Sequence, residues 1–474
     1  MGPDSESRLS LLRGPYRLVS WSVCALVSLN AFEGMGVAAA LPTAVGELGG
    51  LANYGWVFTG YLAASVIGMA SAAYSCDKHG VRVTILTAVA LFVFGLLLAG
   101  TATAMLPLIA GRVIQGLSGG GLMTTVYVMV GALFPEALRP RLFAVISFCW
   151  VIPGIVGPTM SGALTEHVGW RWVFLGLVPV AVAAAALLLP ALRAVRPATP
   201  RTGNANPSRI RSAVAVAIGI GCVERGAQHP DAATLLAATM GVAALAWGLR
   251  GLLPRGTAIA RPGIGAPVAL RGLTAGAFFG VESILPLMMA TQHGLSPLQA
   301  SIPLACAGLP CAISSWWLGR VTGPDALRRR IRLARCGLMM VCCSNASLIW
   351  LSQPTATSWL MNPMWVLAGF GLGLAIPTAN VLVLERTTEH DRAADASALQ
   401  VADTTMSSLT TGASGVLVGL ATRGLLGYSA AFAVIGLSMA ALALLAAVVV
   451  GRLRLHSGLL PGEPLMEGIP NSGG

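Results

Sequence analysis

Charged residues are scarce in this chain of 474 residues, of which Asp, Glu, Lys and Arg make up only 10%. A soluble domain carries about 25% charged residues, so the composition excludes an ordinary soluble globular protein. Hydrophobic residues make up 55% of the chain, and its mean hydropathy is +0.76. We therefore expect an all-α polytopic membrane protein, because helices satisfy their own backbone hydrogen bonds in lipid.

Features that would indicate metal or nucleic-acid binding are also missing. None of the nine cysteines belongs to a CxxC motif or to a Cys/His spacing typical of metal sites. We expect packing roles for them, with no metal and no cofactor. The net charge of +12 could suggest nucleic-acid binding, but the arginines lie in short loops between apolar runs, as the positive-inside rule explains. The expected partner is a lipid bilayer, not a nucleic acid.

Apolar runs long enough to cross a membrane recur along the whole chain. About 20 mostly apolar residues span the hydrocarbon core. Fourteen such stretches can be placed, at residues 17–43, 54–76, 83–103, 107–133, 141–165, 171–193, 208–226, 232–253, 268–291, 297–319, 331–352, 362–384, 396–421 and 428–451.

The seventh stretch has the shortest apolar core, at 213–223. Arg209 and Arg211 could snorkel to the interface at one end, and Glu224 could reach water at the other. If 208–253 forms one re-entrant hairpin instead, the number of spans is twelve.

Charge in the loops sets the direction of the spans. With the N-terminus in the cytoplasm, the outside loops hold only Arg171, Arg225 and Arg423, and the other loop arginines, Arg271 among them, fall inside. This asymmetry indicates an even number of spans with both termini cytoplasmic. It fits twelve spans as well as fourteen, because removing a pair leaves the direction of the others unchanged.

Polar stretches divide the chain into four parts. We predict a six-span bundle at 1–194, linkers with two additional spans at 195–266, a second six-span bundle at 267–453 and a disordered tail at 454–474. The loops at 77–82 and 319–325, after the second and tenth spans, are both short and basic and contain glycine. Two parallel six-span halves around a two-span insert would give this spacing.

Three carboxylates interrupt the predicted spans. Glu33 is the only charge in the apolar run 18–45, Glu282 lies near the middle of the ninth span, and Asp403 lies in the inner half of the thirteenth. A charge at such depth is costly and usually marks an ion or substrate pathway. All six histidines lie in predicted loops or tails, so intramembrane proton binding would depend on these carboxylates. The alternative for each is a hydrogen bond to a neighbouring helix without a transport role.

One arginine lies well inside a predicted span and begins a recognisable pattern. Arg112 begins the pattern Arg112-Val-Ile-Gln115-Gly116 and lies about 8 Å into the fourth span, which runs inward. Glu33 lies about 15 Å before the outer end of the first span. Both fall in the outer half of the membrane, so a direct or water-bridged contact between Glu33 and Arg112 can form. The alternative is that Arg112 only fixes the packing of its helix.

The fifth span is rich in glycine and proline, with Pro153, Gly154, Gly157, Pro158 and Gly162. Proline kinks a helix, and small residues let a neighbouring helix approach closely. The pattern predicts a hinge or a seal, although spans are enriched in glycine and proline for ordinary packing reasons too.

Together these segments resemble the signatures of one transporter family. The chain is similar to the major facilitator superfamily, and in particular to its fourteen-span drug:proton antiporters. The resemblance covers most of the chain. The matching segments are Phe32-Glu33 to Leu41-Pro42, Trp56 to Leu62, Asp77-Lys78-His79-Gly80-Val81-Arg82, Arg112 with Gln115-Gly116, Gly157-Pro158 with Gly162, Trp170-Arg171-Trp172, and the segment around Glu282.

The resemblance implies a transporter and not an enzyme. It implies that two six-span halves alternate in access and export a lipophilic or cationic compound in exchange for protons. The residues expected to bind protons or substrate are Glu33, Glu282, Asp403 and Arg112. The residues expected to act in gating and conformational change are Asp77, Gly80, Arg82, Gln115, Gly116, Gly157, Pro158 and Gly162.

The chain also departs from the family pattern. Ala73, Ser75 and Val81 replace a glycine, a leucine and a basic residue of the loop signature, and Thr404 stands where the family often has arginine. Export of a lipid or hydrophobic metabolite is therefore an alternative, and a non-transporting scaffold a more distant one. We expect a multi-pass protein of the cytoplasmic membrane that acts as a monomer on a small-molecule substrate.

Overall fold

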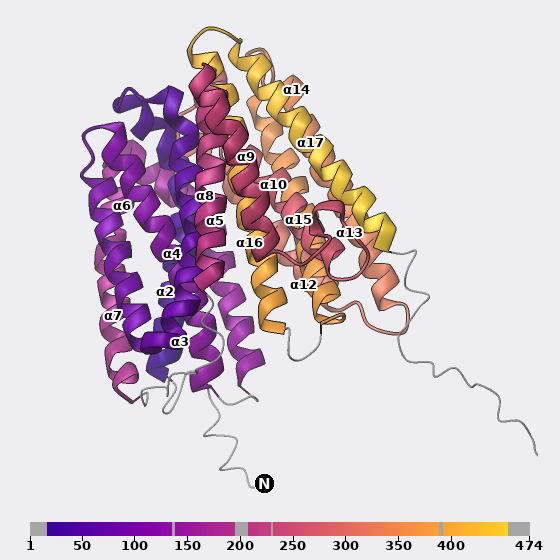
Figure 1. Ribbon diagram of the computed structural model, residues 1–474. Coiled ribbons are helices and arrows are strands. Elements are labelled where there is room, and N and C mark those ends of the chain that lie inside the picture. Colours follow the sequence, from indigo (N-terminus) through magenta and orange to yellow (C-terminus); the bar gives the residue numbers. More distant parts are fainter. Residues whose placement is uncertain (1–16, 135–137, 195–206, 229–230, 388–391, 454–474) are drawn as a thin grey trace, which may run out of the picture.

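The structure is a computed structural model that describes residues 17–134, 138–194, 207–228, 231–387 and 392–453. Within these ranges every regular element is a helix, which confirms the predicted all-α class (Figure 1). The predicted tail at 454–474 and most of the linker after residue 194 lie outside the described residues.

The helices follow one another with short connections. The first part contains α2 (Arg17–Glu47), the 3-10 turn η1 (Leu51–Asn53), α3 (Tyr54–Gly100), α4 (Met105–Leu133), α5 (Arg139–His167), α6 (Arg171–Leu175) and α7 (Leu177–Ala194). Two helices follow, α8 (Pro207–Gln228) and α9 (Ala232–Leu252). The last part contains η2 (Thr257–Ile259), α10 (Gly265–Glu282), α11 (Leu285–His293), α12 (Pro297–Gly319), α13 (Ala326–Ala346), α14 (Leu348–Leu351), η3 (Ser358–Leu360), α15 (Met361–Leu384), α16 (Arg392–Thr422) and α17 (Tyr428–Arg452).

The helices overlap every predicted span. Among the described residues, 11 helical stretches are long and apolar enough to cross a membrane, and one of them covers the 50 residues Leu51–Gly100. The more polar helices α8 and α16 are not among the 11. The chain is thus a multi-pass membrane protein, while the count of fourteen spans and the cytoplasmic position of both termini remain predictions.

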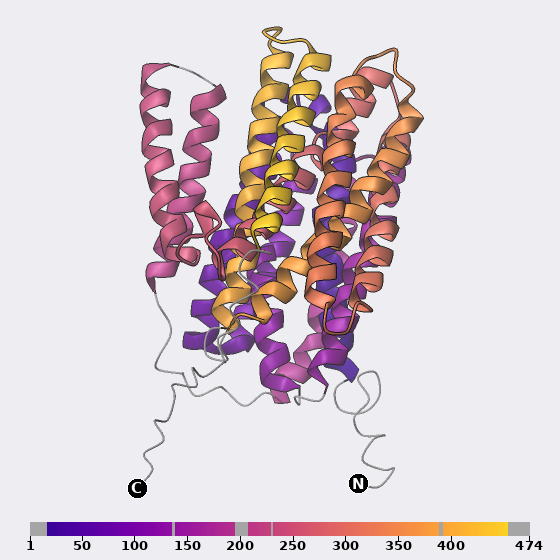
Figure 2. The same ribbon diagram turned by 90° about the vertical axis from the view of Figure 1, so that its right-hand side faces the viewer.

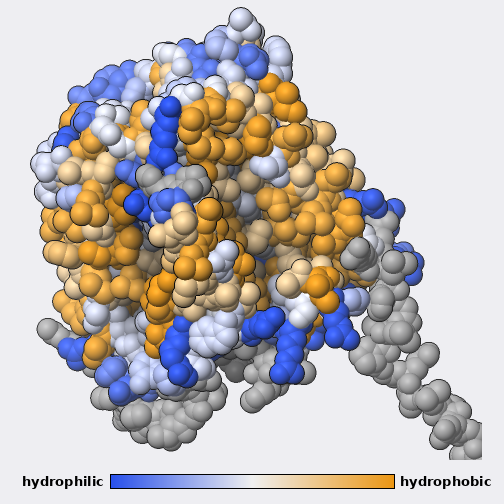
Figure 3. Space-filling view, turned by 45° about the horizontal axis from the view of Figure 1, so that its top comes forward, coloured by the Kyte–Doolittle hydropathy of each residue, from blue (hydrophilic) through white to orange (hydrophobic). Residues whose placement is uncertain are grey.

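The outer surface of the helices is apolar, as lipid requires. Figure 3 shows hydrophobic side chains over the middle of the visible face and hydrophilic ones toward its upper and lower edges. Helix α9 is typical, because Leu236, Met240 and Trp247 are each more than half exposed. Large apolar side chains exposed in this number would be an aggregation hazard in water, but they are stable against lipid tails.

Helix α3 reverses direction at Gly80. Gly80 has φ +82° and ψ 163°, a backbone conformation that glycine adopts without steric penalty. Thr84 on one side of the bend donates a hydrogen bond to Ser75 on the other at 2.8 Å. The predicted loop 77–82 is therefore a sharp bend between two spans.

The predicted ninth span is not one continuous helix. It breaks after Glu282, and α11 begins at Leu285. Pro286 explains the break, since its nitrogen has no hydrogen to donate to the carbonyl oxygen of Glu282 four residues earlier. Glu282 therefore lies at the end of a helix within a span.

Two groups of helices lie side by side. Helices α2 to α7 form one group and α10 to α17 the other (Figure 1). They contact each other chiefly through α3 with α16 and through α5 with α12. Figure 2 shows α8 and α9 as a hairpin at one side of the bundle, where α8 packs against both α3 and α16.

The packing of α8 corrects one expectation. Glu224 was expected to reach water at the end of the seventh span, but it is only 3% exposed. Helix α8 continues to Gln228 and is enclosed by α3 and α16 at this point, so the carboxylate is buried.

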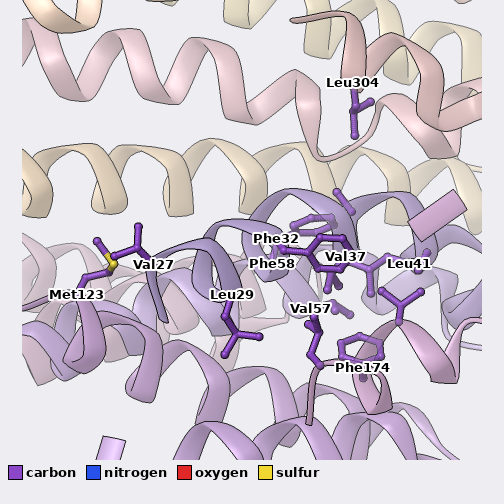
Figure 4. Packing of buried hydrophobic residues seen from close by; sticks show 14 of the residues in the cluster. Val27, Leu29, Phe32, Val37, Leu41, Val57, Phe58, Met123, Phe174 and Leu304 are labelled. Atoms are coloured by element: carbon purple, nitrogen blue, oxygen red, sulfur yellow. The ribbon is translucent and has the colours of Figure 1, made fainter. Parts of the chain in front are cut away.

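A continuous apolar core holds the two groups of helices together. Its largest cluster combines residues of α2, α3, α4 and α6 with residues of α10, α12, α15 and α17. Figure 4 shows Phe32, Phe58 and Val37 close together, with Leu304 of α12 pointing toward them from the other group. Within a membrane this core stabilises the fold mainly through close van der Waals packing, because lipid tails are as apolar as the core itself.

Candidate functional site

Glu33 and Arg112 form an ion pair between α2 and α4. Their side chains are 0% and 2% exposed. The contact expected from their depths in the membrane is thus present. A buried ion pair gives little net stability, because desolvation of both charges offsets their attraction. Its presence in a membrane protein therefore calls for a functional explanation.

Arg112 has partners besides Glu33. Its Nη1 donates to Oε1 of Gln115 at 2.8 Å, and its Nε donates to the carbonyl oxygen of Val57 at 3.2 Å. Its guanidinium also lies over the ring of Tyr61, 4.3 Å from the ring centre. Three groups other than the carboxylate thus hold the cation in place.

Glycines bring α3 and α4 close enough to form this site. A Cβ atom on Gly116 would overlap the carbonyl group of Tyr61, and one on Gly120 would overlap that of Ser65. Only glycine fits at these positions, which agrees with the close approach predicted for Gly116. The contact sets Tyr61 beside Arg112.

A second ion pair links α10 and α16. Arg271 donates to Oδ2 of Asp403 through Nε at 2.7 Å and through Nη2 at 2.5 Å. Its guanidinium also donates to Asn380 and Gln400. The two charged side chains are 13% and 16% exposed, so this pair is more accessible than that of Glu33.

Arg271 is a further candidate site residue, which the sequence alone did not indicate. It was assigned to an inside loop, but α10 begins at Gly265 and contains it. Its position within the predicted span 268–291 was the available signal. The cation next to Asp403 comes from another helix and not from position 404 of the same one, where the family often has arginine.

Glu282 belongs to neither of these two ion pairs. It is half-buried at the break between α10 and α11. No hydrogen bond or ion pair joins it to another described residue. The structure therefore places Glu282 apart from Glu33, on the other group of helices.

Helices α3 and α16 meet closely near the start of α3 and the end of α16, on the side of the bundle that the predicted topology places outside. We call this contact between Gly55, Thr59, Ser408 and Gly415 the outer seam. A Cβ on Gly55 would lie 2.8 Å from the Cα of Gly415, so the two backbones touch. Ser408 donates to the carbonyl oxygen of Thr59 at 3.4 Å.

Tyr54 extends the outer seam to the helix break. Its hydroxyl donates to the carbonyl oxygen of Ser283 at 2.8 Å, and Ser414 donates to that of Gly280 at 2.9 Å. The backbone freed by the break in this span is thus bonded by side chains from both groups of helices.

Helix α5, which contains the predicted fifth span, packs against both groups of helices, and it does so through different glycines. Gly157 faces α2, where an added Cβ would lie 3.4 Å from Phe32. Gly162 faces α12, where an added Cβ would lie 2.6 Å from the hydroxyl of Ser301. Pro158 is buried between them. The predicted close packing is present, while a role in sealing remains a proposal.

The predicted gating residues lie at the bend of α3. Arg82 is exposed, Asp77 is half-buried and Gly80 forms the turn. Among the described residues, neither Asp77 nor Arg82 forms an ion pair. In this structure the bend of α3 is therefore not tied to the second group of helices by charge.

Among the described residues, the histidines and the possible metal ligands form no further site. His79, His167 and His293 were expected in loops, but they fall in helices, with His293 ending α11 and its Nε2 2.9 Å from the carbonyl oxygen of Leu351. His229, His390 and His456 lie outside the described residues. Within those ranges no group of three His, Cys, Asp or Glu side chains could hold a metal ion.

Comparison with known families finds one match across most of the chain. The model of the Major Facilitator Superfamily matches residues 23–411.

Two similar proteins come from fungi. The MFS-type efflux pump LUC4 of a Fusarium species is 31% identical over 197 residues, which are 42% of this chain and 35% of that protein. The acurin A biosynthesis cluster MFS-type transporter of Aspergillus aculeatus is 32% identical over 161 residues, 34% of this chain and 29% of its own length. The chain spans about a third of the length of the curated relatives it matches.

A solved structure with the same fold covers nearly the whole chain. The auto-inhibited POT family peptide transporter superposes with a TM-score of 0.67 and 16% identity, over 94% of this chain and 97% of that one. At this identity the likeness establishes the fold and leaves the substrate open.

Proposed function

The chain belongs to the major facilitator superfamily, and from this premise we propose that it is a secondary active transporter that exports lipophilic or cationic compounds in exchange for protons. The observation that carries the proposal is the buried pair of Glu33 and Arg112. Charged residues inside a span are costly and usually mark an ion or substrate pathway. Export is further supported by the efflux pump among the relatives.

The geometry suggests how Glu33 exchanges partners. When Glu33 takes up a proton it loses its attraction to Arg112, but Arg112 keeps Gln115, the carbonyl of Val57 and the ring of Tyr61. The cation then has no counter-ion, but these three neutral contacts reduce the cost of keeping it buried. Glu33 can alternate between a proton and Arg112, as a coupling residue must.

The second ion pair is a suitable place for a cationic substrate. Asp403 is partly exposed and shares its carboxylate with Arg271. A cation that binds Asp403 would displace Arg271 toward Asn380 and Gln400, which already accept from it. Glu282 offers a further carboxylate without a cationic partner among the described residues. We assign proton exchange to Glu33 and substrate contact to Asp403 and Glu282.

The packing of the helices fits one state of an alternating-access cycle. Contacts close the outer seam, while Asp77 and Arg82 at the opposite end form no ion pair among the described residues. We assign this structure to an inward-open state. The division at 1–194, 195–266 and 267–453, action as a monomer and residence in the cytoplasmic membrane belong to the same proposal.

Transport in proteoliposomes tests the function. Vesicles that contain the protein and an inward-directed or outward-directed proton gradient are given ethidium as a cationic lipophilic probe. We expect ethidium to move against the direction of the proton flux and to stop moving when a protonophore is added. Ethidium flux that is the same with and without the gradient would refute proton antiport.

A second candidate is export of a hydrophobic metabolite. One observation favours it, namely that a relative belongs to a biosynthesis cluster. In the same vesicles this function would appear as proton release driven by a neutral hydrophobic compound and not by ethidium.

A further inference from the structure

Glu224 is a buried carboxylate that the proposed mechanism leaves unused. It lies on α8, in the two-helix insert, and is 3% exposed. Helix α8 contacts α3 and α16 at the point where the two groups of helices meet. The insert thus contributes a titratable group to the boundary across which the two halves must move.

The carboxylate of Glu224 lies directly against the outer seam. A Cβ on Gly55 would lie 2.8 Å from its Oε1 as well as 2.8 Å from Gly415. A Cβ on Gly412 would lie 3.4 Å from its Oε2 and 3.2 Å from the hydroxyl of Thr59. Glycines of both α3 and α16 therefore make room for this side chain.

One oxygen of this carboxylate has only a neutral hydroxyl beside it. Oε1 of Glu224 accepts a hydrogen bond from Gln228 at 3.4 Å. Oε2 of Glu224 and the hydroxyl of Thr59 both face Gly412 and interact with each other, without a hydrogen bond of good geometry. A hydroxyl can donate to the ionised carboxylate or accept from the protonated one, so it permits both states and supplies no positive charge.

The surrounding charges do not neutralise the carboxylate. Among the described ion pairs none includes Glu224. On its own helix Arg225 is exposed. Directly after α16, the guanidinium of Arg423 donates to the backbone carbonyl of Gln228 at 2.5 Å. From α9 Asp231 caps its own helix, and from α3 the hydroxyl of Tyr54 is bonded to Ser283.

We propose that Glu224 is a further proton-binding residue, which must take up a proton from the outer side before the outer seam can close. This inference rests on the proposed proton-coupled export. When the seam is open, water carries a proton to Oε2 of Glu224. The neutral carboxyl group can then be enclosed between Gly55 and Gly412, whereas an ionised one would be enclosed without a compensating cation, which is costly. Opening of the seam returns the proton to water on the outer side.

Distance measurement between the two halves tests this site. Spin labels are attached to noncanonical residues at Val168 and Leu425, which are 58% and 73% exposed at the outer ends of α5 and α16. The full-length protein is reconstituted without substrate or gradient and examined from about pH 5 to about pH 9. We expect a short distance at low pH, and a growing population with a longer distance as the pH rises.

Three variants test whether Glu224 causes the change in label distance with pH. Glu224→Gln should keep the short distance at every pH, and Glu224→Asp should retain the pH response. The control Glu47→Gln removes an outer carboxylate that is 52% exposed and should behave as the unmodified protein does. An unchanged pH response in Glu224→Gln, or its loss in Glu47→Gln, would overturn the assignment. Because the readout needs no transport, failure of proton antiport would be seen separately in the vesicle assay.

Discussion

Glu33 of α2 and Arg112 of α4 form an ion pair from which solvent is excluded, with side-chain exposures of 0% and 2%. The guanidinium is at the same time bonded to Gln115 and to the backbone of Val57. The two partners are therefore unequal. Loss of Glu33 leaves a cation with other contacts, while loss of Arg112 leaves a buried carboxylate without its cation.

Stability measurements should reveal this inequality. We expect Arg112→Leu to lower the free energy of unfolding by about 3–5 kcal/mol, because it leaves a buried charge unpaired. Glu33→Gln should cost less, and the double variant should cost less than the sum of the two single losses. Denaturant titration in detergent measures these differences. Strictly additive losses would show that the two residues do not interact.

The pair of Arg271 and Asp403 should control the affinity for cations. Asp403→Asn removes the carboxylate, so we expect the dissociation constant of ethidium to rise by about tenfold. Arg271→Gln removes the competing cation, so ethidium should bind at least as tightly as to the unmodified protein. Equilibrium binding in detergent distinguishes the two. Equal weakening in both variants would mean that the pair is only structural.

The sequence predicted the helices well because an apolar run is a local property. The predicted span 297–319 coincides with α12, and that at 428–451 differs from α17 by one residue. Contacts between helices could be predicted only where two charged residues fall at a similar depth in the membrane, as Glu33 and Arg112 do. The partner of Asp403 was missed because Arg271 lies on a helix distant in sequence. The burial of Glu224 was missed because it depends on how α8 packs between α3 and α16.

The outer seam should depend on the absence of a side chain at position 55. Gly55→Ala places a methyl group 2.8 Å from both Gly415 and Glu224, so the two helices must separate. We expect a loss of about 1–3 kcal/mol in stability of the closed seam, and a longer distance between labels at Val168 and Leu425 at low pH.

The matched control for this substitution is Gly34→Ala. Gly34 is exposed on α2, and an added Cβ would meet no atom within 4 Å. This variant should retain the label distance and gain up to about 1 kcal/mol in stability. If Gly55→Ala behaved as Gly34→Ala does, close contact at the seam would be irrelevant to its closure.

The break at Glu282 should be needed for turnover. Pro286→Ala restores an N–H that can donate to the carbonyl of Glu282, which would join α10 and α11 into one helix. We expect stability to be kept or increased, and ethidium transport to fall by about tenfold, because unwound segments supply flexible binding groups in transporters. Transport at the original rate with a continuous helix would show that the break has no role.

Proton release in inverted vesicles tests the coupling role of Glu33 most directly. Vesicles that contain the protein are acidified inside, and ethidium is added while the internal pH is recorded. We predict that ethidium causes proton release with the unmodified protein, reduced release with Glu33→Asp and none with Glu33→Gln, because only a carboxylate can exchange a proton for Arg112. Equal ethidium-induced release with Glu33→Gln and with the unmodified protein would contradict the account.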